Sequence, residues 1–210
     1  MKKIVIIPDS FKGTMSSKEV GEIIKEEALA SWPEVEVIRA EVADGGEGSV
    51  EAFLSVLPGN REYVTVSGPY GEPVTACYGM LGETAVIEMA AAFLGARLQS
   101  GIDVVLETIY FDKMLEDCSL VITGEGKIDG QSMQGKVVSG VARRAAKKNV
   151  PVLVVVGAID EGAEAMYDAG VSAIFSINQK PLPFEAIQDR TKSDLRKTVQ
   201  FSDLQRGQNK

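Results

Sequence analysis

Residues 3–31, KIVIIPDSFKGTMSSKEVGEIIKEEALAS, decide the fold class of this chain. Lys3–Ile7 is a short β-branched run that predicts a strand, and the loop after it begins with Pro8-Asp9-Ser10. The helix expected over Ser16–Ser31 has apolar residues at helical spacing, at Val20, Ile23, Ile24, Ala28 and Leu29. Ser16 followed by Glu19 is a capping-box pattern that places the helix start. Strand, loop and helix in this order form the first unit of an α/β fold.

The same alternation continues along the rest of the chain. Further strands are expected at 35–42, 63–66, 74–78, 84–88, 120–123, 152–156 and 173–177. Further helices are expected at 46–57, 103–115, 132–148, 163–169 and 184–204. Strands that alternate with helices in this way predict a three-layer αβα fold with a mainly parallel, Rossmann- or flavodoxin-like sheet.

The composition excludes several classes of function. A net charge of −8 argues against a nucleic-acid partner, because binding to that backbone relies on a basic stripe. The chain has no histidine, so Ser-His and Cys-His nucleophiles are excluded, and acid-base chemistry falls to Asp, Glu, Lys or Tyr. No apolar run approaches the ~20 residues that cross a bilayer, so no membrane partner is expected.

The start of the chain and its cysteines favour a cytoplasmic location. The apolar run Ile4–Ile7 stops at Pro8-Asp9 with no small-residue cleavage site, which is unlike a secretory signal. Cys77 and Cys118 are far apart and have no metal or redox spacing, which is typical of two reduced thiols.

Three polar loops are expected at strand ends, where parallel sheets bind their ligands. In the first loop, Asp9, Ser10 and Lys12 follow the strand within four residues and bring a carboxylate, a hydroxyl and an ammonium group together. This set suits an anionic substrate. A solvated turn explains Asp9 and Ser10 equally well, since both are ordinary turn residues.

The second loop is Ala43-Asp44-Gly45-Gly46-Glu47-Gly48. Its glycines Gly45, Gly46 and Gly48 let a ligand approach bare backbone N–H groups at the start of the following helix, a familiar anion-binding arrangement. Asp44 and Glu47 could hold Mg²⁺ or accept the proton of a substrate hydroxyl. The alternative is an N-capped helix, with Asp44 as cap and Glu47 as its first-turn acid.

The third loop is expected at Thr123-Gly124-Glu125-Gly126-Lys127-Ile128-Asp129, with Gln131 and Lys136 close behind. It again has a glycine-acid-glycine pattern after a buried strand. The spacing fits neither a Walker loop nor a dinucleotide fingerprint, so the pattern by itself specifies no ligand.

Several long segments resemble the bacterial glycerate kinase family. The resemblance rests on PDSFKGTMS (8–16), ADGGEGSVEAF (43–53), SGPYGEPVTACYG (67–79), TAVIEMAAA (84–92) and LVITGEGKIDGQSMQGK (120–136), which occur in the family in this order. It covers nearly the whole chain, from Lys3 to about Gln200. It implies ATP-dependent phosphorylation of D-glycerate to a phosphoglycerate, with Mg²⁺ as the metal.

The resemblance also implies roles for the three loops. The substrate would be bound by Asp9, Ser10, Lys12, Gly45, Gly46 and Gly48. The catalytic residues would be Lys12, Asp44, Glu47 and Asp129, and the base would be Asp44, Glu47 or Asp129. Gly124, Glu125, Gly126, Gln131 and Lys136 would bind the nucleotide. Glu125 and Asp129 would hold the Mg²⁺.

One large departure separates this chain from the family pattern. Family members carry a domain-sized segment with a glycine-rich loop between the equivalents of Ala92 and Phe93, and this segment is absent here. We therefore expect one α/β domain over 1–204, built from an N-terminal half (1–92) and a C-terminal half (93–204), with a polar tail at 205–210. The alternative function is a core that folds and binds glycerate or anions without catalysis. An apolar surface left by the lost segment would favour a homodimer.

Overall fold

The computed structural model of the chain describes residues 1–42, 50, 53–54, 57–67, 72–82, 84–86, 101–130, 136–178, 180 and 183–201. Its main sheet has five parallel strands in the order β2-β1-β6-β7-β8. Their bounds are β1 Lys3–Ile6, β2 Glu36–Arg39, β6 Leu120–Ile128, β7 Val152–Ile159 and β8 Ala173–Ser176. The predicted α/β class with a mainly parallel sheet is confirmed.

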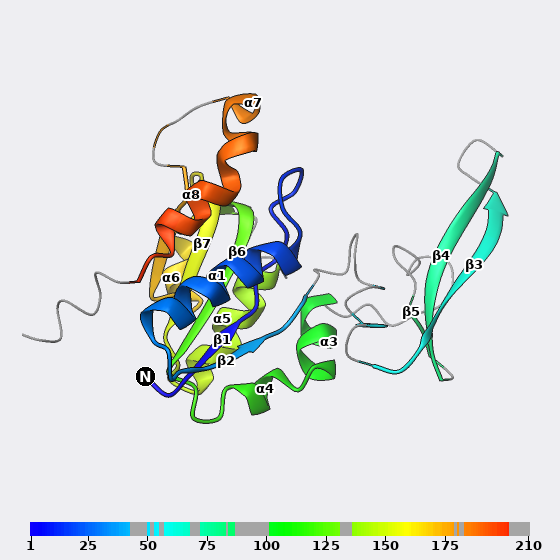
Figure 1. Cartoon of the computed structure of the whole chain (residues 1–210). Helices are drawn as coiled ribbons and strands as arrows, with labels where there is room; N and C mark the ends of the chain where they lie inside the picture. Colours follow the sequence, from blue (N-terminus) through cyan, green and yellow to red (C-terminus); the bar gives the residue numbers. More distant parts are fainter. Residues whose placement is uncertain are drawn as a thin grey trace, which may run out of the picture.

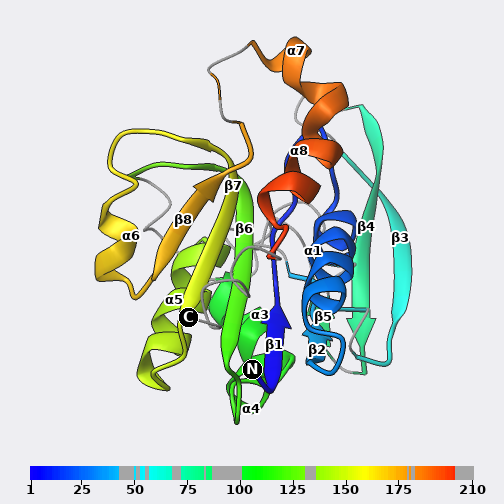
Figure 2. The same cartoon turned by 60° about the vertical axis from the view of Figure 1, so that its left-hand side comes forward.

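Helices cover both faces of this sheet, as Figures 1 and 2 show. Alternate residues along β1 and the following Ile7 point to opposite faces: Ile4 and Ile6 pack in one core cluster, and Val5 and Ile7 in the other. The first cluster includes residues of α1 (Ser17–Ser31) and α8 (Thr191–Thr198). The second includes residues of α3 (Gly101–Thr108), α4 (Phe111–Met114), α5 (Val137–Lys147) and α6 (Ala165–Asp168). These layers make up the expected αβα arrangement.

The first helix begins as its sequence predicts. The Ser16 side chain accepts a hydrogen bond from the Glu19 backbone N–H at 3.2 Å, and the Ser16 backbone N–H donates to the Glu19 carboxylate at 3.0 Å. Both halves of the capping box are therefore present.

The three strands that follow β2 along the chain form a second, antiparallel sheet. It has the order β3-β4-β5, with bounds Asn60–Ser67, Pro73–Leu81 and Thr84–Val86. Figure 1 shows this sheet to one side of the parallel sheet. Every residue of β3 is exposed. Of the preceding helix expected at 46–57, only Val50, Phe53 and Leu54 are described as helical.

Three predicted helices are divided or begin more than two residues later in the structure. The helix expected at 103–115 is two helices, because Tyr110 between them has a left-handed backbone with φ of 55°. The helix expected at 132–148 begins at Val137, with Lys136 extended before it. The helix expected at 184–204 is divided into α7 (Phe184–Ile187), η2 (Gln188–Arg190) and α8, which ends at Thr198.

No helix in the described ranges is long and apolar enough to cross a membrane.

Candidate functional site

A pocket of about 400 Å³ lies at the carboxyl ends of β1, β6, β7 and β8. This is the edge at which open parallel sheets bind their ligands. The loop after β1 contributes Asp9, Ser10, Phe11, Lys12 and Thr14 to its lining. The predicted first loop therefore lines a cavity at this edge of the sheet.

The loop after β1 is held tightly against the sheet. The Asp9 N–H donates to the carbonyl of Gly124 at 2.8 Å, which continues the β1–β6 pairing past the end of β1. Phe11 and Met15 exchange two backbone hydrogen bonds, at 2.9 and 3.0 Å, across a turn in which Gly13 has φ of 79°. Both side chains are buried, so they anchor the loop and leave Lys12 exposed between them. An anchored loop that lines a cavity is not simply a solvated turn.

The third expected loop is a strand, which corrects the prediction that β6 ends at Thr123. β6 extends to Ile128 and stays paired with β7 from Val121↔Val152 to Ile128↔Ile159. Glycine and charged residues predicted a loop, but pairing with β7, interrupted only at Gly126, holds this backbone extended. Glu125, 5% exposed, lines the pocket together with Gly126 and Lys127 from within the strand.

The two glycines of β6 make room for the protein's own chain. A Cβ on Gly124 would meet the carbonyl oxygen of Val155 in β7 and would lie 3.6 Å from the Phe11 ring. A Cβ on Gly126 would lie 3.3 Å from the Lys12 backbone nitrogen. Close approach of the first loop and of β7 therefore accounts for this glycine-acid-glycine pattern without a ligand.

Lys127 forms an ion pair with Asp160 at 2.7 Å, although both side chains are more than half exposed. The hydrogen bond between them raises the pKa of Lys127 and lowers the pKa of Asp160. The negative charge of Asp129 also raises the pKa of Lys127. Asp129 follows the end of β6 and does not line the pocket, so the two predicted metal residues differ in position: Glu125 lines the cavity and Asp129 does not.

Lys136 also lines the pocket, from the N-terminal end of α5. It is the extended N-cap residue of this helix, whose positive end favours anions nearby. Gln131 lies outside the described residues. Asp44, Gly45, Gly46, Glu47 and Gly48 also lie outside them, so their predicted roles stay predictions.

The far side of the pocket was not predicted from the sequence. Gly157 and Ala158 come from β7, Ile177 and Asn178 follow β8, and Ile187 and Thr191 flank η2. Asn178 had a usable signal, because it directly follows a predicted strand of the parallel sheet. The sequence has no such signal for Ile187 and Thr191, because both lie within the single helix expected at 184–204.

Two carboxylates, Asp9 and Glu125, and three lysines therefore line the cavity at the ends of β1 and β6. This set suits an anion together with a cation such as Mg²⁺. Within the described part of the chain, no three acidic or cysteine side chains cluster closely enough to form a metal cage. Mg²⁺ is commonly held by one or two carboxylates plus substrate phosphates, so Glu125 in the pocket wall fits that pattern.

The fold is that of an α/β protein with a cavity at the carboxyl edge of a parallel sheet, the edge at which proteins of this class bind small molecules. A family model described as the glycerate kinase family matches the chain over residues 4–93 and 90–201. The chain belongs to the glycerate kinase family, as its sequence motifs predicted.

Individual relatives support this assignment. The chain is 24% identical to the glycerate kinase of Bacillus subtilis, over 87% of this chain and 92% of the relative. It is 23% identical to the glycerate 2-kinase of Escherichia coli, over 83% and 90% of the two chains. A solved structure from Salmonella typhimurium LT2, assigned as a glycerate kinase 2, superposes with a TM-score of 0.76 and 20% identity, covering 100% of both chains. That structure supports the fold alone.

The relatives also confirm the missing middle segment. The alignment with the Bacillus subtilis protein spans 351 positions, which is 141 more than the 210 residues of this chain. The family match is divided in two at residues 90–93, where the sequence motifs placed the gap. These junction residues lie outside the described part of the structure.

Proposed function

We propose that this chain binds D-glycerate and ATP in the pocket at the carboxyl ends of β1, β6, β7 and β8 and transfers the γ-phosphoryl group to glycerate. One observation carries the proposal: a chain of the glycerate kinase family has Lys12, Lys136 and Glu125 around one cavity. Phosphoryl transfer depends mainly on positioning and charge neutralisation, which such a set can supply without histidine.

The first loop is proposed to bind the glycerate carboxylate. Lys12 is exposed at the pocket, and no carboxylate pairs with it in the described ranges, so its ammonium can bind an anion. Ser10 offers a hydroxyl beside it, and the Asp9 carboxylate accepts a hydrogen bond from the Ser10 backbone at 2.6 Å, which orders the turn. Gly45, Gly46 and Gly48 would add backbone N–H donors, on the evidence of the sequence alone.

In the proposed reaction, a glycerate hydroxyl oxygen forms a bond to the γ-phosphorus while the bond from that phosphorus to the β-phosphate oxygen breaks. ADP leaves, and the hydroxyl proton passes to a carboxylate. Three residues are candidates for that carboxylate: Asp44, Glu47 and Asp129. The Lys12 and Lys136 ammonium groups would neutralise charge on the transferred phosphate and on the phosphates of the nucleotide.

Glu125 is the residue proposed to hold Mg²⁺, with Asp129 as a second candidate. When bound, Mg²⁺ would neutralise phosphate charge and orient the phosphates. Gly124, Gly126, Gln131 and Lys136 complete the proposed nucleotide-binding set.

A second function, glycerate or anion binding without turnover, is favoured by the missing segment. Kinases exclude water and hold the phosphates from both sides during transfer. The alignment with the Bacillus subtilis relative spans 141 more positions than this chain has residues. The core alone would then bind ligands through the described pocket without closing over them.

Two measurements separate these functions. A coupled ADP-release assay with D-glycerate, alongside the Bacillus subtilis relative, tests turnover. Calorimetry with glycerate and with Mg-ATP separately tests binding. Turnover above background supports the kinase. Glycerate binding without turnover supports the binding core, and the absence of both contradicts both proposals.

A further inference from the structure

The lining of the pocket is divided by charge along the sheet. The charged residues are Asp9 and Lys12 after β1, Glu125 and Lys127 in β6, and Lys136 before α5. The residues from β7, β8 and the segment around η2 are all uncharged. Since the strand order is β1-β6-β7-β8, the uncharged residues of β7 and those after β8 lie beside the charged residues of β6 along the sheet edge, and the segment around η2 lines the pocket from outside the sheet.

The uncharged end combines apolar surface with a few polar groups. Ile177, Ile187 and Ala158 supply apolar surface, and Asn178 and Thr191 supply the polar groups. Asn178 Nδ2 donates to the carbonyl of Gly157 at 2.7 Å, and Thr191 Oγ1 donates to the carbonyl of Ile187 at 3.0 Å. These bonds hold the wall in place before any ligand binds, which lowers the ordering cost of binding.

The size of the cavity also exceeds the needs of glycerate. About 400 Å³ falls in the range of pockets that bury drug-sized ligands, whereas glycerate is a three-carbon acid with polar groups on every carbon. Such an acid would gain little from the isoleucine wall. A ligand that fills both ends must have an anionic part and a larger, mostly uncharged part.

We infer that the uncharged end, formed by Gly157, Ala158, Ile177, Asn178, Ile187 and Thr191, binds the nucleoside of the phosphate donor. The phosphates then extend toward Lys12 and Lys136 at the charged end, where glycerate would meet them. This inference rests on the proposed function and adds the orientation of the nucleotide across the sheet edge.

The test compares ADP with pyrophosphate, which has the same two linked phosphates without the nucleoside. Dissociation constants of both are measured by calorimetry on the full chain at one fixed Mg²⁺ concentration. Ala158→Phe fills the uncharged end from an exposed position, so the fold is expected to tolerate it. Ile159→Phe is the matched control, because Ile159 is the next residue of β7, is 50% exposed and does not line the pocket.

The unaltered chain is expected to bind ADP at least tenfold more tightly than pyrophosphate. Ala158→Phe should raise the dissociation constant of ADP at least tenfold and change that of pyrophosphate less than twofold. Ile159→Phe should change neither constant. If Ala158→Phe does not fold, Ile187→Ala shortens a side chain of the same wall, and it should raise the dissociation constant of ADP several-fold and leave that of pyrophosphate unchanged.

Equal affinity for ADP and pyrophosphate in the unaltered chain would overturn the inference, as would a variant that weakens both ligands by the same factor or weakens neither. In those cases, retained binding of pyrophosphate and of glycerate would leave the proposed function standing. If ADP, pyrophosphate and glycerate all fail to bind, the inference and the proposed function are both wrong.

Discussion

At Gly124 the first loop, β6 and β7 approach one another closely. The Gly124 carbonyl accepts the bond from Asp9, and a Cβ there would meet the Val155 carbonyl oxygen. We expect Gly124→Ala to lower the free energy of unfolding by roughly 1–3 kcal/mol, because β7 or the first loop must shift to make room. Urea unfolding measures the loss.

Gly130→Ala is the matched control for that substitution. A Cβ on Gly130 would have only ordinary contacts, at 3.8 and 3.9 Å, so a change within about 0.5 kcal/mol is expected. If the two variants are equally stable, the close approach at Gly124 is not what requires glycine.

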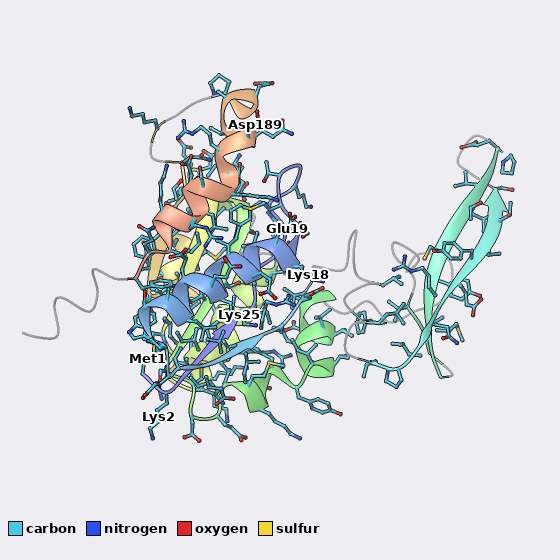
Figure 3. All side chains as sticks on the ribbon, viewed as in Figure 1. Met1, Lys2, Lys18, Glu19, Lys25 and Asp189 are labelled. Carbon is cyan, nitrogen blue, oxygen red and sulfur yellow. The ribbon has the colours of Figure 1, made fainter. Side chains whose placement is uncertain are left out.

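Lys12 is the residue on which the proposed anion site depends most. Lys12→Met keeps much of the side-chain length and removes the charge. A hydrogen bond to a charged group contributes about 1.5–3 kcal/mol, so glycerate affinity should fall tenfold or more in calorimetry. Lys18→Met is the control, since Lys18 is an exposed residue of α1 that does not line the pocket (Figure 3). An equal loss in both variants would indicate a general charge effect instead of a specific contact.

At the scale of elements, Glu19 joins the start of α1 to α8 (Figure 3). Its carboxylate binds Lys192 at 2.6 Å and accepts the Ser16 N–H, and these bonds lower its pKa from 4.5 to about 2. The pKa of Glu19 is lower in the folded state than in the unfolded state, so its charged carboxylate stabilises the fold. This stabilisation is fully present above pH 4.5. It is lost as the pH falls from 4.5 to about 2.

Glu19→Gln keeps a capping side chain and removes the charge, so it isolates this effect. The Glu19 side chain is 45% exposed, and exposed pairs contribute only about 0.2–1 kcal/mol. The variant should therefore be less stable by up to about 1 kcal/mol at pH 7, and the difference should vanish near pH 2. Glu34→Gln, at an exposed carboxylate with no ion pair in the described ranges, should show no such pH-dependent difference.

The sequence predicts most elements of the parallel sheet because β1 and α1 have clear periodicity and a capping box. It misplaces the end of β6, since glycine and charged residues are typical of loops, and only pairing with β7 keeps Thr123–Ile128 extended. For the site, Asp9, Ser10 and Lys12 were predictable as neighbours in one loop. Ile187 and Thr191 were not, because their place at the pocket depends on how the C-terminal helices pack.

At the scale of the whole molecule, helices cover both faces of the parallel sheet, whereas one face of the antiparallel sheet has exposed valines. Val64, Val66 and Val74 are 40–45% exposed. The register Val64↔Ala76 and Val66↔Val74, together with strand alternation, puts these residues on one face. The family match is divided shortly after β5, at residues 90–93, and this chain lacks the additional segment that relatives have there.

A second copy of this chain presents the same valine face, so a two-fold contact can bury both faces at once, and we expect a homodimer. Light scattering should then give a dimer mass that falls on dilution. Val66→Lys should give a monomer, because two lysines per contact would lose their water or meet each other. Thr65→Lys introduces the same charge at the next residue of β3, on the opposite face, and should leave the dimer intact. A monomer mass for the unaltered chain at every concentration, or equal effects of the two lysines, would rule this face out as the contact.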